Sequence, residues 1–210
     1  MTRVAGILLA AGEGSRLGQP KALVELGGQT LAERGVAMLY DGGAAPVIVV
    51  AGPVRVSVPT AWTVRNLDWR TGMGSSVRTG LQSLDLDGGP GDAPIGPRPQ
   101  AGELAGIGAA IIALADQPLV GAEAVQRLIA AYAGGAQVAV AAYDGQPRNP
   151  VLIAREHWPA VIELATGDAG ARPFLRARPE LVTLVECGDT GSPFDIDTQA
   201  DLDRVSSMFT

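Results

Sequence analysis

Short apolar runs alternate along the chain with segments in which apolar residues recur every three or four positions. The runs lie at 4–10, 46–51, 62–66, 107–114, 138–142, 151–153 and 181–187 and are rich in Val, Ile, Leu and Ala. Most of them end at glycines or polar residues. An uninterrupted apolar run of this length is typical of a strand buried on both faces of a parallel sheet.

Capping signals predict helices between these strands. Thr30 is followed three residues later by Glu33, which is a capping box, and Gly42 closes that helix. Thr198 and Asp201 open a C-terminal helix in the same way. Further helical segments are expected at 76–84 (with Ser75 or Ser76 as the N-cap), 122–133, 155–165 and 173–177.

Strands and helices that alternate in this way predict an α/β fold with a mostly parallel sheet covered on both faces. Residues 85–106 are rich in Gly and Pro and lack apolar periodicity, so we interpret them as a mobile surface loop and not a domain boundary. Residues 144–149 and 166–171 are expected to be connections. The 210 residues therefore form one predicted domain, 1–210.

The composition narrows the class of protein. Hydrophobic residues make up 47% of the chain and aromatic residues 4%, so the core is built from aliphatic side chains. A net charge of −6 argues against nucleic acid or an anionic membrane as a partner. The N-terminus lacks the pattern of a signal peptide, and Cys187 is the single cysteine. We expect a cytoplasmic protein without an intrachain disulfide.

The first apolar run ends in a glycine-rich loop that contains Gly12, Gly14, Gly18 and Arg16, with Lys21 close behind. Glycines let the backbone approach a phosphate and adopt positive φ. Consecutive free N–H groups can then point at the phosphate oxygens. The loop predicts an anion site, although a glycine-rich turn that binds nothing would have the same composition.

The spacing excludes two better-known phosphate loops. Gly12, Gly14 and Gly18 leave one residue too many before the third glycine for the dinucleotide fingerprint. Lys21 stands between a proline and an alanine, whereas the Walker loop needs it between Gly and Ser or Thr. Lys21 is also the only lysine beside fifteen arginines. A site that requires a compact, flexible positive charge would retain a lysine at this position. The alternative is that a single lysine remains by chance.

Two acidic positions are candidate metal ligands. Asp116 lies just beyond the carboxyl end of the apolar run 107–114. Ligands of open α/β sheets bind beyond the carboxyl ends of the strands. A carboxylate there suits Mg²⁺, which joins one or two carboxylates to substrate phosphates; capping of the next helix is the alternative. Asp195 and Asp197 follow the last strand, and Asp197 has the stronger claim because it directly precedes Thr198.

Other polar residues are weaker candidates. Ser75 and Ser76 begin a predicted helix whose free N–H groups favour an anion or a nucleobase carbonyl, although ordinary capping explains them as well. Asp168 and Arg172 lie in a polar loop that either contacts substrate or joins two helices. His157 is the only histidine, and we interpret it as structural.

Five motifs follow one another in order from about residue 4 to the C-terminal helix. They lie at 8–21, 72–76, 114–118, 167–172 and 195–198. Together they resemble the MobA-like nucleotidyltransferases and, within that family, the molybdenum cofactor cytidylyltransferase branch. The resemblance implies a three-layer α/β/α, Rossmann-like nucleotidyltransferase fold. It also implies Mg²⁺-dependent transfer of a nucleoside monophosphate from an NTP to a phosphorylated acceptor.

The resemblance also suggests roles for individual residues. The nucleotide-binding set is Leu9, Ala10, Ala11, Gly12, Gly14, Ser15, Arg16, Lys21, Gly74, Ser75 and Ser76. The catalytic set is Lys21, Arg16 and Asp116. The metal ligands are Asp116 and Asp197. The acceptor-binding set is Asn149, Asp168, Arg172 and Asp195.

Some positions depart from the family pattern. The cytidylyltransferase branch commonly carries Gly-His-Pro where this chain has Arg-Asn-Pro at 148–150, and the loop 85–106 is unusually long. Ala11 is similar to the cytidylyltransferase branch, whereas guanylyltransferases more often carry glycine there. The alanine favours CTP, although related enzymes for sugar phosphates share it.

The hypothesis from the sequence is transfer of CMP from CTP to molybdopterin with release of pyrophosphate. An acceptor phosphate is largely dianionic at neutral pH and needs no general base. GTP as the nucleotide, or a sugar or polyol phosphate as the acceptor, remains an alternative. A chaperone that hands the pterin to a molybdoenzyme apoprotein without transfer is an alternative of another class. A nicotinamide dehydrogenase is disfavoured by the glycine spacing.

Overall fold

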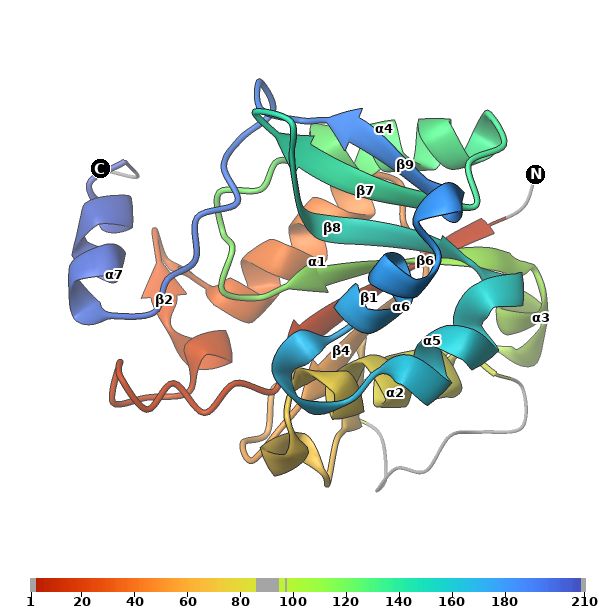
Figure 1. Ribbon diagram of the computed structural model, residues 1–210. Coiled ribbons are helices and arrows are strands. Elements are labelled where there is room, and N and C mark those ends of the chain that lie inside the picture. The colour runs from red at the N-terminus through yellow and green to blue at the C-terminus, as the bar shows by residue number, and fades with distance from the viewer. Residues whose placement is uncertain (1–2, 86–94, 97, 209–210) are drawn as a thin grey trace.

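A seven-stranded sheet forms the centre of the protein (Figure 1). The computed structural model describes residues 3–85, 95–96 and 98–208. The strand order is β5-β4-β1-β6-β8-β7-β9. The strands are β1 (Arg3–Ala10), β4 (Val47–Ala51), β5 (Trp62–Arg65), β6 (Ile107–Leu114), β7 (Val138–Tyr143), β8 (Gln146–Ala154) and β9 (Val182–Glu186). A separate hairpin consists of β2 (Glu25–Leu26) and β3 (Gln29–Thr30).

The sheet is mostly parallel, as the sequence predicted. Strand β8 is antiparallel to both of its neighbours, and the other neighbouring pairs are parallel. Parallel strands need helical crossovers, which cover both faces of the sheet. The α/β class expected from the alternation of strands and helices is therefore confirmed.

Helices pack on the two faces of the sheet to give three layers (Figure 1). Helices α1 (Leu31–Asp41) and α4 (Ala122–Ala133) cover one face, and α2 (Met73–Ser83), α5 (Trp158–Leu164) and α6 (Arg172–Ala177) cover the other. Successive residues of β1 serve the two sides, because Leu8 joins the core under α1 and Ile7 joins the core under α2. The capping box of Thr30 and Glu33 begins α1 as predicted.

A third, smaller core holds the C-terminal segment. Helix α7 (Gln199–Ser206) begins at the predicted Thr198 capping box. Its Val205 packs with Ile196 and with Leu26 of the small hairpin. The packing of Ile196 in this cluster holds residues 195–197 near the carboxyl end of β6, where the Ile196 amide donates to the Asp116 carbonyl.

Two of the expected segments are wrong in their extent. The connection expected at 144–149 is a two-residue turn, because Asp144 and Gly145 both have positive φ, as a tight hairpin requires. Pairing resumes at once between Tyr143 and Gln146. Helix α2 begins at Met73 and not at residue 76, with Gly72 as its N-cap at φ 105°.

The segment 85–106 is also more ordered than expected where it is described. Helix α3 (Ala101–Ala105) begins at a capping box of Gln100 and Glu103. Ile95 bridges to Thr63 on strand β5. The loop interpretation is wrong for these residues because local capping and strand pairing supply hydrogen bonds without apolar periodicity. Residues 86–94 and 97, on which the rest of the expected mobile loop falls, lie outside the described residues.

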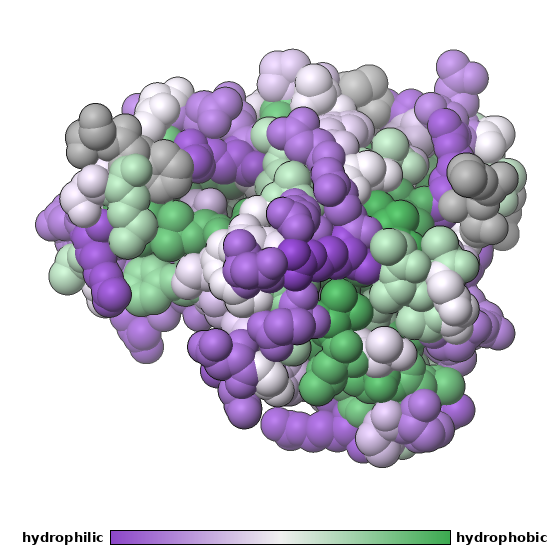
Figure 2. All heavy atoms as spheres, turned by 90° about the horizontal axis from the view of Figure 1, so that it is seen from above, coloured by the Kyte–Doolittle hydropathy of each residue, from purple (hydrophilic) through white to green (hydrophobic). Residues whose placement is uncertain are grey.

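The surface over the β9 edge is mixed. Figure 2 looks onto this side of the molecule and shows hydrophilic atoms in a band across its middle, with hydrophobic atoms exposed beside them. Leu184 of β9 is half exposed. Over the part of the chain that the structure describes, no helix is long and apolar enough to cross a membrane.

Replacing Ile111 by Ala should lower the free energy of unfolding by about 2–5 kcal/mol, because the cavity left in a packed core collapses only partly. Ile111 is fully buried in β6 at the centre of the sheet. Urea denaturation measures the change. Leu67→Ala is the control, since Leu67 is 63% exposed. Equal losses for the two variants would contradict a central position for β6.

Candidate active site

The carboxyl ends of β1 and β6 meet at one edge of the sheet. The two strands pair in parallel with Leu9 opposite Leu114, and the Ala115 amide donates to the Leu9 carbonyl at 3.1 Å. The glycine loop therefore leaves the sheet beside Asp116. This is the edge at which open α/β sheets bind ligands.

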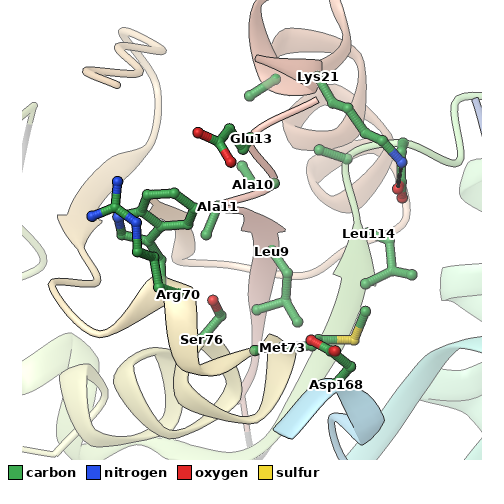
Figure 3. A pocket seen from close by; sticks show the side chains of 16 residues that line it. Leu9, Ala10, Ala11, Glu13, Lys21, Arg70, Met73, Ser76, Leu114 and Asp168 are labelled. Atoms are coloured by element: carbon green, nitrogen blue, oxygen red, sulfur yellow. Dashed lines mark hydrogen bonds and ion pairs between the residues drawn. The ribbon is translucent and has the colours of Figure 1, made fainter. Parts of the chain in front are cut away.

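A cavity of about 530 Å³ opens at this edge (Figure 3). Its walls come from residues 9–13, Lys21 and Ala22, residues 69–70 and 72–73, Ser76, residues 114–116 and Asp168. In the close-up, Leu9 forms the floor, with Lys21 on one side and Arg70 on the other. The volume falls in the usual range for a small-molecule site.

Lys21 joins the two acids that the sequence marked as metal ligands. Its ammonium nitrogen lies 2.7 Å from Asp116 Oδ2 and 2.5 Å from Asp197 Oδ1. The Lys21 side chain is only 17% exposed. Burial lowers the pKa of Lys21, but the charges and hydrogen bonds of Asp116 and Asp197 outweigh burial, so the pKa is raised from the ordinary value of a lysine. The ammonium group is therefore charged throughout the physiological range.

Backbone hydrogen bonds bring Asp197 to this position. The Ile196 amide donates to the Asp116 carbonyl at 2.8 Å, and the Ile196 side chain is fully buried in the small third core. Asp197 follows directly and precedes the first turn of α7. The two acids are 81 residues apart in sequence and share one ammonium group in space.

Gln117 also holds the segment that precedes α7 in place. Its amide nitrogen donates to the Pro193 carbonyl at 3.2 Å and to Asp195 Oδ1 at 2.9 Å. Partial burial and the nearby charge of Asp116 raise the pKa of Asp195, while the Gln117 hydrogen bond acts in the opposite direction. Asp195 thus contacts Gln117 and does not line the cavity. Gln117 lies in the motif at 114–118, but the sequence did not indicate that its side chain would bond to Pro193 and Asp195.

Glycines set the close packing around α2. A Cβ atom on Gly72 would lie 2.4 Å from the Gly167 carbonyl carbon, and one on Gly74 would lie 2.7 Å from backbone atoms of Ala165. Arg78 donates to the Ala165 carbonyl and holds the same segment. This approach places Asp168 in the cavity wall. Gly74 packs against backbone and does not line the cavity.

A smaller recess of about 30 Å³ adjoins the cavity. It shares Leu9, Met73 and Leu114 with the larger space, and Asn149 and Arg172 are among its polar lining residues. Two residues of the expected acceptor set thus lie beside the main cavity, and Asp168 lies in it. The rest of the recess wall is largely apolar.

The structure brings most of the expected nucleotide-binding residues to the cavity. Gly14, Ser15, Arg16, Gly74 and Ser75 are the expected ones that do not line it. Gly14 instead closes the loop, because the Leu17 amide donates to its carbonyl at 2.9 Å. The roles of all these residues remain predictions.

Three charged or aromatic lining residues were absent from the expected sets. Glu13, Trp69 and Arg70 all face the cavity. The Arg70 guanidinium carbon lies 4.6 Å from the centre of the Trp69 ring, within range of a cation–π contact. Trp69 and Arg70 fell in a polar glycine loop, and their neighbours in sequence did not indicate which side chains would turn inward.

The Asp116 and Asp197 carboxylates fit a divalent cation. Their oxygens converge on one positive charge, which in this structure is the Lys21 ammonium group. Hard oxygen donors suit Mg²⁺ or Mn²⁺. Among the described residues, no group of three or more His, Cys, Asp or Glu side chains could hold a metal ion. A cation here would therefore take further ligands from water or from phosphates.

Comparison with known proteins places this geometry in context. The sequence profile of the MobA-like NTP transferase domain matches residues 6–182. A nicotine blue oxidoreductase of Paenarthrobacter nicotinovorans is 35% identical over 216 residues, which cover 96% of each chain. A probable molybdenum cofactor guanylyltransferase of Opitutus terrae is 49% identical over 47 residues, which cover 22% of this chain and 23% of the relative.

Solved structures share the fold. The Rv0371c homologue of Mycobacterium sp. strain JC1 superposes with a TM-score of 0.77 at 28% identity, covering 99% of this chain and 96% of that one. Rv0371c of Mycobacterium tuberculosis, solved as a complex with manganese, gives a TM-score of 0.72 at 20% identity, covering 98% and 99%.

Gly14→Ala should lower the melting temperature much more than Gly18→Ala. Both glycines have φ near +70°, so both variants carry a left-handed penalty of about 1–2 kcal/mol. Only at Gly14 would the new methyl group meet an obstacle, because it would lie 1.8 Å from the Gln19 carbonyl oxygen. Differential scanning fluorimetry tests the difference. Equal shifts would mean that the loop is not closed around Gly14.

Proposed function

The chain belongs to the MobA-like NTP transferase family and is a nucleotidyltransferase, and on this premise we propose that it transfers CMP from CTP to a phosphorylated acceptor, with molybdopterin as the leading candidate. The observation that carries the proposal is the Lys21 contact with Asp116 and Asp197 beside a glycine loop. Positive charge and the proposed metal-binding oxygens would then lie at one end of a cavity of about 530 Å³, which is large enough for a nucleotide.

The proposed reaction is an in-line displacement. A phosphate oxygen of the acceptor forms a bond to the α-phosphorus, the bond from that phosphorus to the bridging oxygen breaks, and pyrophosphate leaves with the electron pair. The attacking phosphate is already deprotonated at neutral pH. The chain must therefore position the reactants and offset negative charge. Lys21 suits this role because its raised pKa keeps it charged, and Arg16 is proposed to add charge from the loop.

Asp116 and Asp197 are the proposed ligands of Mg²⁺, which would supply positive charge to the phosphate oxygens of the bound nucleotide. The support comes from their shared contact with one ammonium group. A neighbour of the same fold has been solved with manganese, which agrees with a divalent cation in this family of structures.

The nature of the acceptor rests on fewer observations. The relative named as a probable molybdenum cofactor guanylyltransferase supports a pterin acceptor. Asp168 in the cavity and Asn149 and Arg172 in the recess are the proposed acceptor contacts. Ala11 in the cavity wall supports CTP through the family resemblance. GTP, or a sugar phosphate as acceptor, are the alternatives within this chemistry.

A second candidate function is an oxidoreductase, for which the nicotinamide dehydrogenase considered from the sequence is the testable form. The observation in its favour is the relative named nicotine blue oxidoreductase, which matches along nearly the whole chain. The glycine spacing of the first loop differs from the dinucleotide fingerprint, which favours transfer over reduction. Both activities are directly measurable.

The first test measures pyrophosphate release with Mg²⁺, molybdopterin and each of the four NTPs. We expect release with CTP and a loss of at least about a hundredfold in Lys21→Ala, because positioned charge is a large part of such catalysis. Arg176→Ala, on an exposed position of α6, is the control. Release with GTP alone would move the assignment to guanylyl transfer. Oxidation of NADH or NADPH without pyrophosphate release would replace it with the reductase.

Lys21→Met should bind Mn²⁺ more tightly than the parent protein in the absence of nucleotide. The Lys21 ammonium group is bonded to the carboxylates that a metal ion would need. Because hydrogen bonds between charged groups are strong, their loss in the variant should raise the affinity for Mn²⁺ by about tenfold. Isothermal titration calorimetry provides the affinity. Lys21→Arg keeps the charge and should stay close to the parent. Weaker binding by the methionine variant would show that Lys21 holds the acids together for the metal and does not compete with it.

A further inference from the structure

A buried amide at the carboxyl end of β5 connects to the cavity. Asn66 is only 2% exposed, and every polar atom of its side chain has a partner. Its Oδ1 accepts a hydrogen bond from the Asp68 amide at 2.9 Å. Its Nδ2 donates to Ser75 Oγ at 2.8 Å and to Ser76 Oγ at 3.0 Å. One side chain thus links β5, the loop before α2 and the first turn of α2.

The direction of these hydrogen bonds follows from one backbone group. A backbone N–H can only donate, so the Asn66 atom that faces the Asp68 amide must be the carbonyl oxygen. The nitrogen of the same amide then faces the serines, and this nitrogen can only donate. Both serine hydroxyl oxygens are therefore acceptors toward Asn66. Their own protons must go elsewhere.

The two serines differ in where those protons go. Ser75 Oγ donates to the carbonyls of Asp68 and Gly72 at 3.0 and 2.8 Å, so its proton is used within the protein. Ser76 Oγ lies in the cavity wall and has no acceptor within the described part of the chain (Figure 3). Asn66 therefore leaves Ser76 with a free O–H donor at the cavity.

The position of Ser76 indicates which part of a nucleotide it meets. In Figure 3, Ser76 and Arg70 lie on one side of the cavity, and Lys21 lies on the opposite side. The Lys21 side carries the charge suited to phosphates. The Ser76 side carries Arg70, whose guanidinium carbon lies 4.6 Å from the centre of the Trp69 ring, and aromatic side chains form platforms on which bases stack. The base of a nucleotide that spans the cavity would lie beside Ser76.

We propose that Asn66 is a positioning residue that holds Ser76 as a hydrogen-bond donor to a carbonyl oxygen of the nucleobase. This inference rests on the proposed function. Cytosine, guanine and uracil each carry a ring carbonyl, whereas adenine carries none. A site whose donor is fixed toward the ligand discriminates against a base that leaves it unpaired. Ser76 and Asn66 thus select carbonyl-bearing bases over adenine.

The first experiment measures equilibrium binding of CTP, GTP, UTP and ATP to the full chain by calorimetry, without acceptor. Ser76→Ala should weaken the tightest-binding carbonyl nucleotide about tenfold, the value of one good hydrogen bond. ATP affinity should change less than twofold. Ser83→Ala is the matched control: it removes a serine hydroxyl of the same helix that donates to the Thr79 carbonyl away from the cavity.

Asn66→Asp tests the positioning role. The new carboxylate can still accept from the Asp68 amide, but its second oxygen must accept from the serines. Ser76 would then turn its proton toward residue 66 and present an acceptor to the cavity. We expect the same selective loss as in Ser76→Ala. In the double variant the two losses should not add, because both remove one donor. A purely structural effect of Asn66→Asp would weaken all four nucleotides alike.

Several outcomes overturn the inference. Equal losses for ATP and the carbonyl nucleotides in Ser76→Ala would place Ser76 on the ribose or phosphates. Normal CTP and GTP binding by a folded Asn66→Asp variant would show that Asn66 does not set the proton direction. Failure of Asn66→Asp to fold still leaves Ser76→Ala to decide on the base contact. If the parent protein binds no nucleotide, the proposed function fails together with this inference, whereas unaltered selectivity in the variants overturns the inference alone.

Discussion

The contact of Lys21 with Asp116 and Asp197 is the interaction around which the candidate site is built. One ammonium group offsets two carboxylates that come from the end of β6 and from the segment before α7. Without the Lys21 ammonium group, the two negatively charged carboxylates would face each other at the edge of the cavity. Their repulsion costs free energy unless another cation takes the place of the ammonium group. The same contact gathers the carboxylates that are the proposed ligands of a metal ion beside the lysine that is proposed to contact phosphates.

Two buried amides hold the walls on either side of this contact. Gln117 ties the segment of Pro193 and Asp195 to the end of β6, and Asn66 ties the first turn of α2 to the end of β5. The Asn66 amide is bonded through both its oxygen and its nitrogen, whereas Gln117 is bonded through its nitrogen only, and its Oε1 is buried without a hydrogen-bond partner among the described residues. The bonds of each amide fix the position of the segments that they join. Apolar packing of Ile196 completes the fastening on the α7 side. The residues of the candidate site lie largely on connections, and hydrogen bonds attach these connections to the ends of the strands.

Much of the fold followed from local patterns in the sequence. The apolar runs of β1 and β6 are buried along nearly their whole length, and such runs need a parallel sheet covered on both faces. The capping boxes at Thr30 and Thr198 placed two helix starts correctly because their hydrogen bonds are local. The errors fell in short segments whose structure depends on a few local hydrogen bonds or on positive φ and not on apolar periodicity. The Asp144-Gly145 turn, the early start of α2 and the short helix α3 leave little apolar signal.

For the site, the sequence by itself determined the chemical inventory: one lysine, a glycine loop, acids after two strands and two serines near the start of a helix. The residue types and their spacing along the chain can be recognised without any knowledge of tertiary contacts. Tertiary structure alone decided which of them meet. Lys21 and Asp197 are 176 residues apart, and Trp69 and Arg70 turn into the cavity although nothing near them in sequence requires it. Contacts between distant segments depend on sheet order and on the packing of Ile196, which arise only when the whole chain folds.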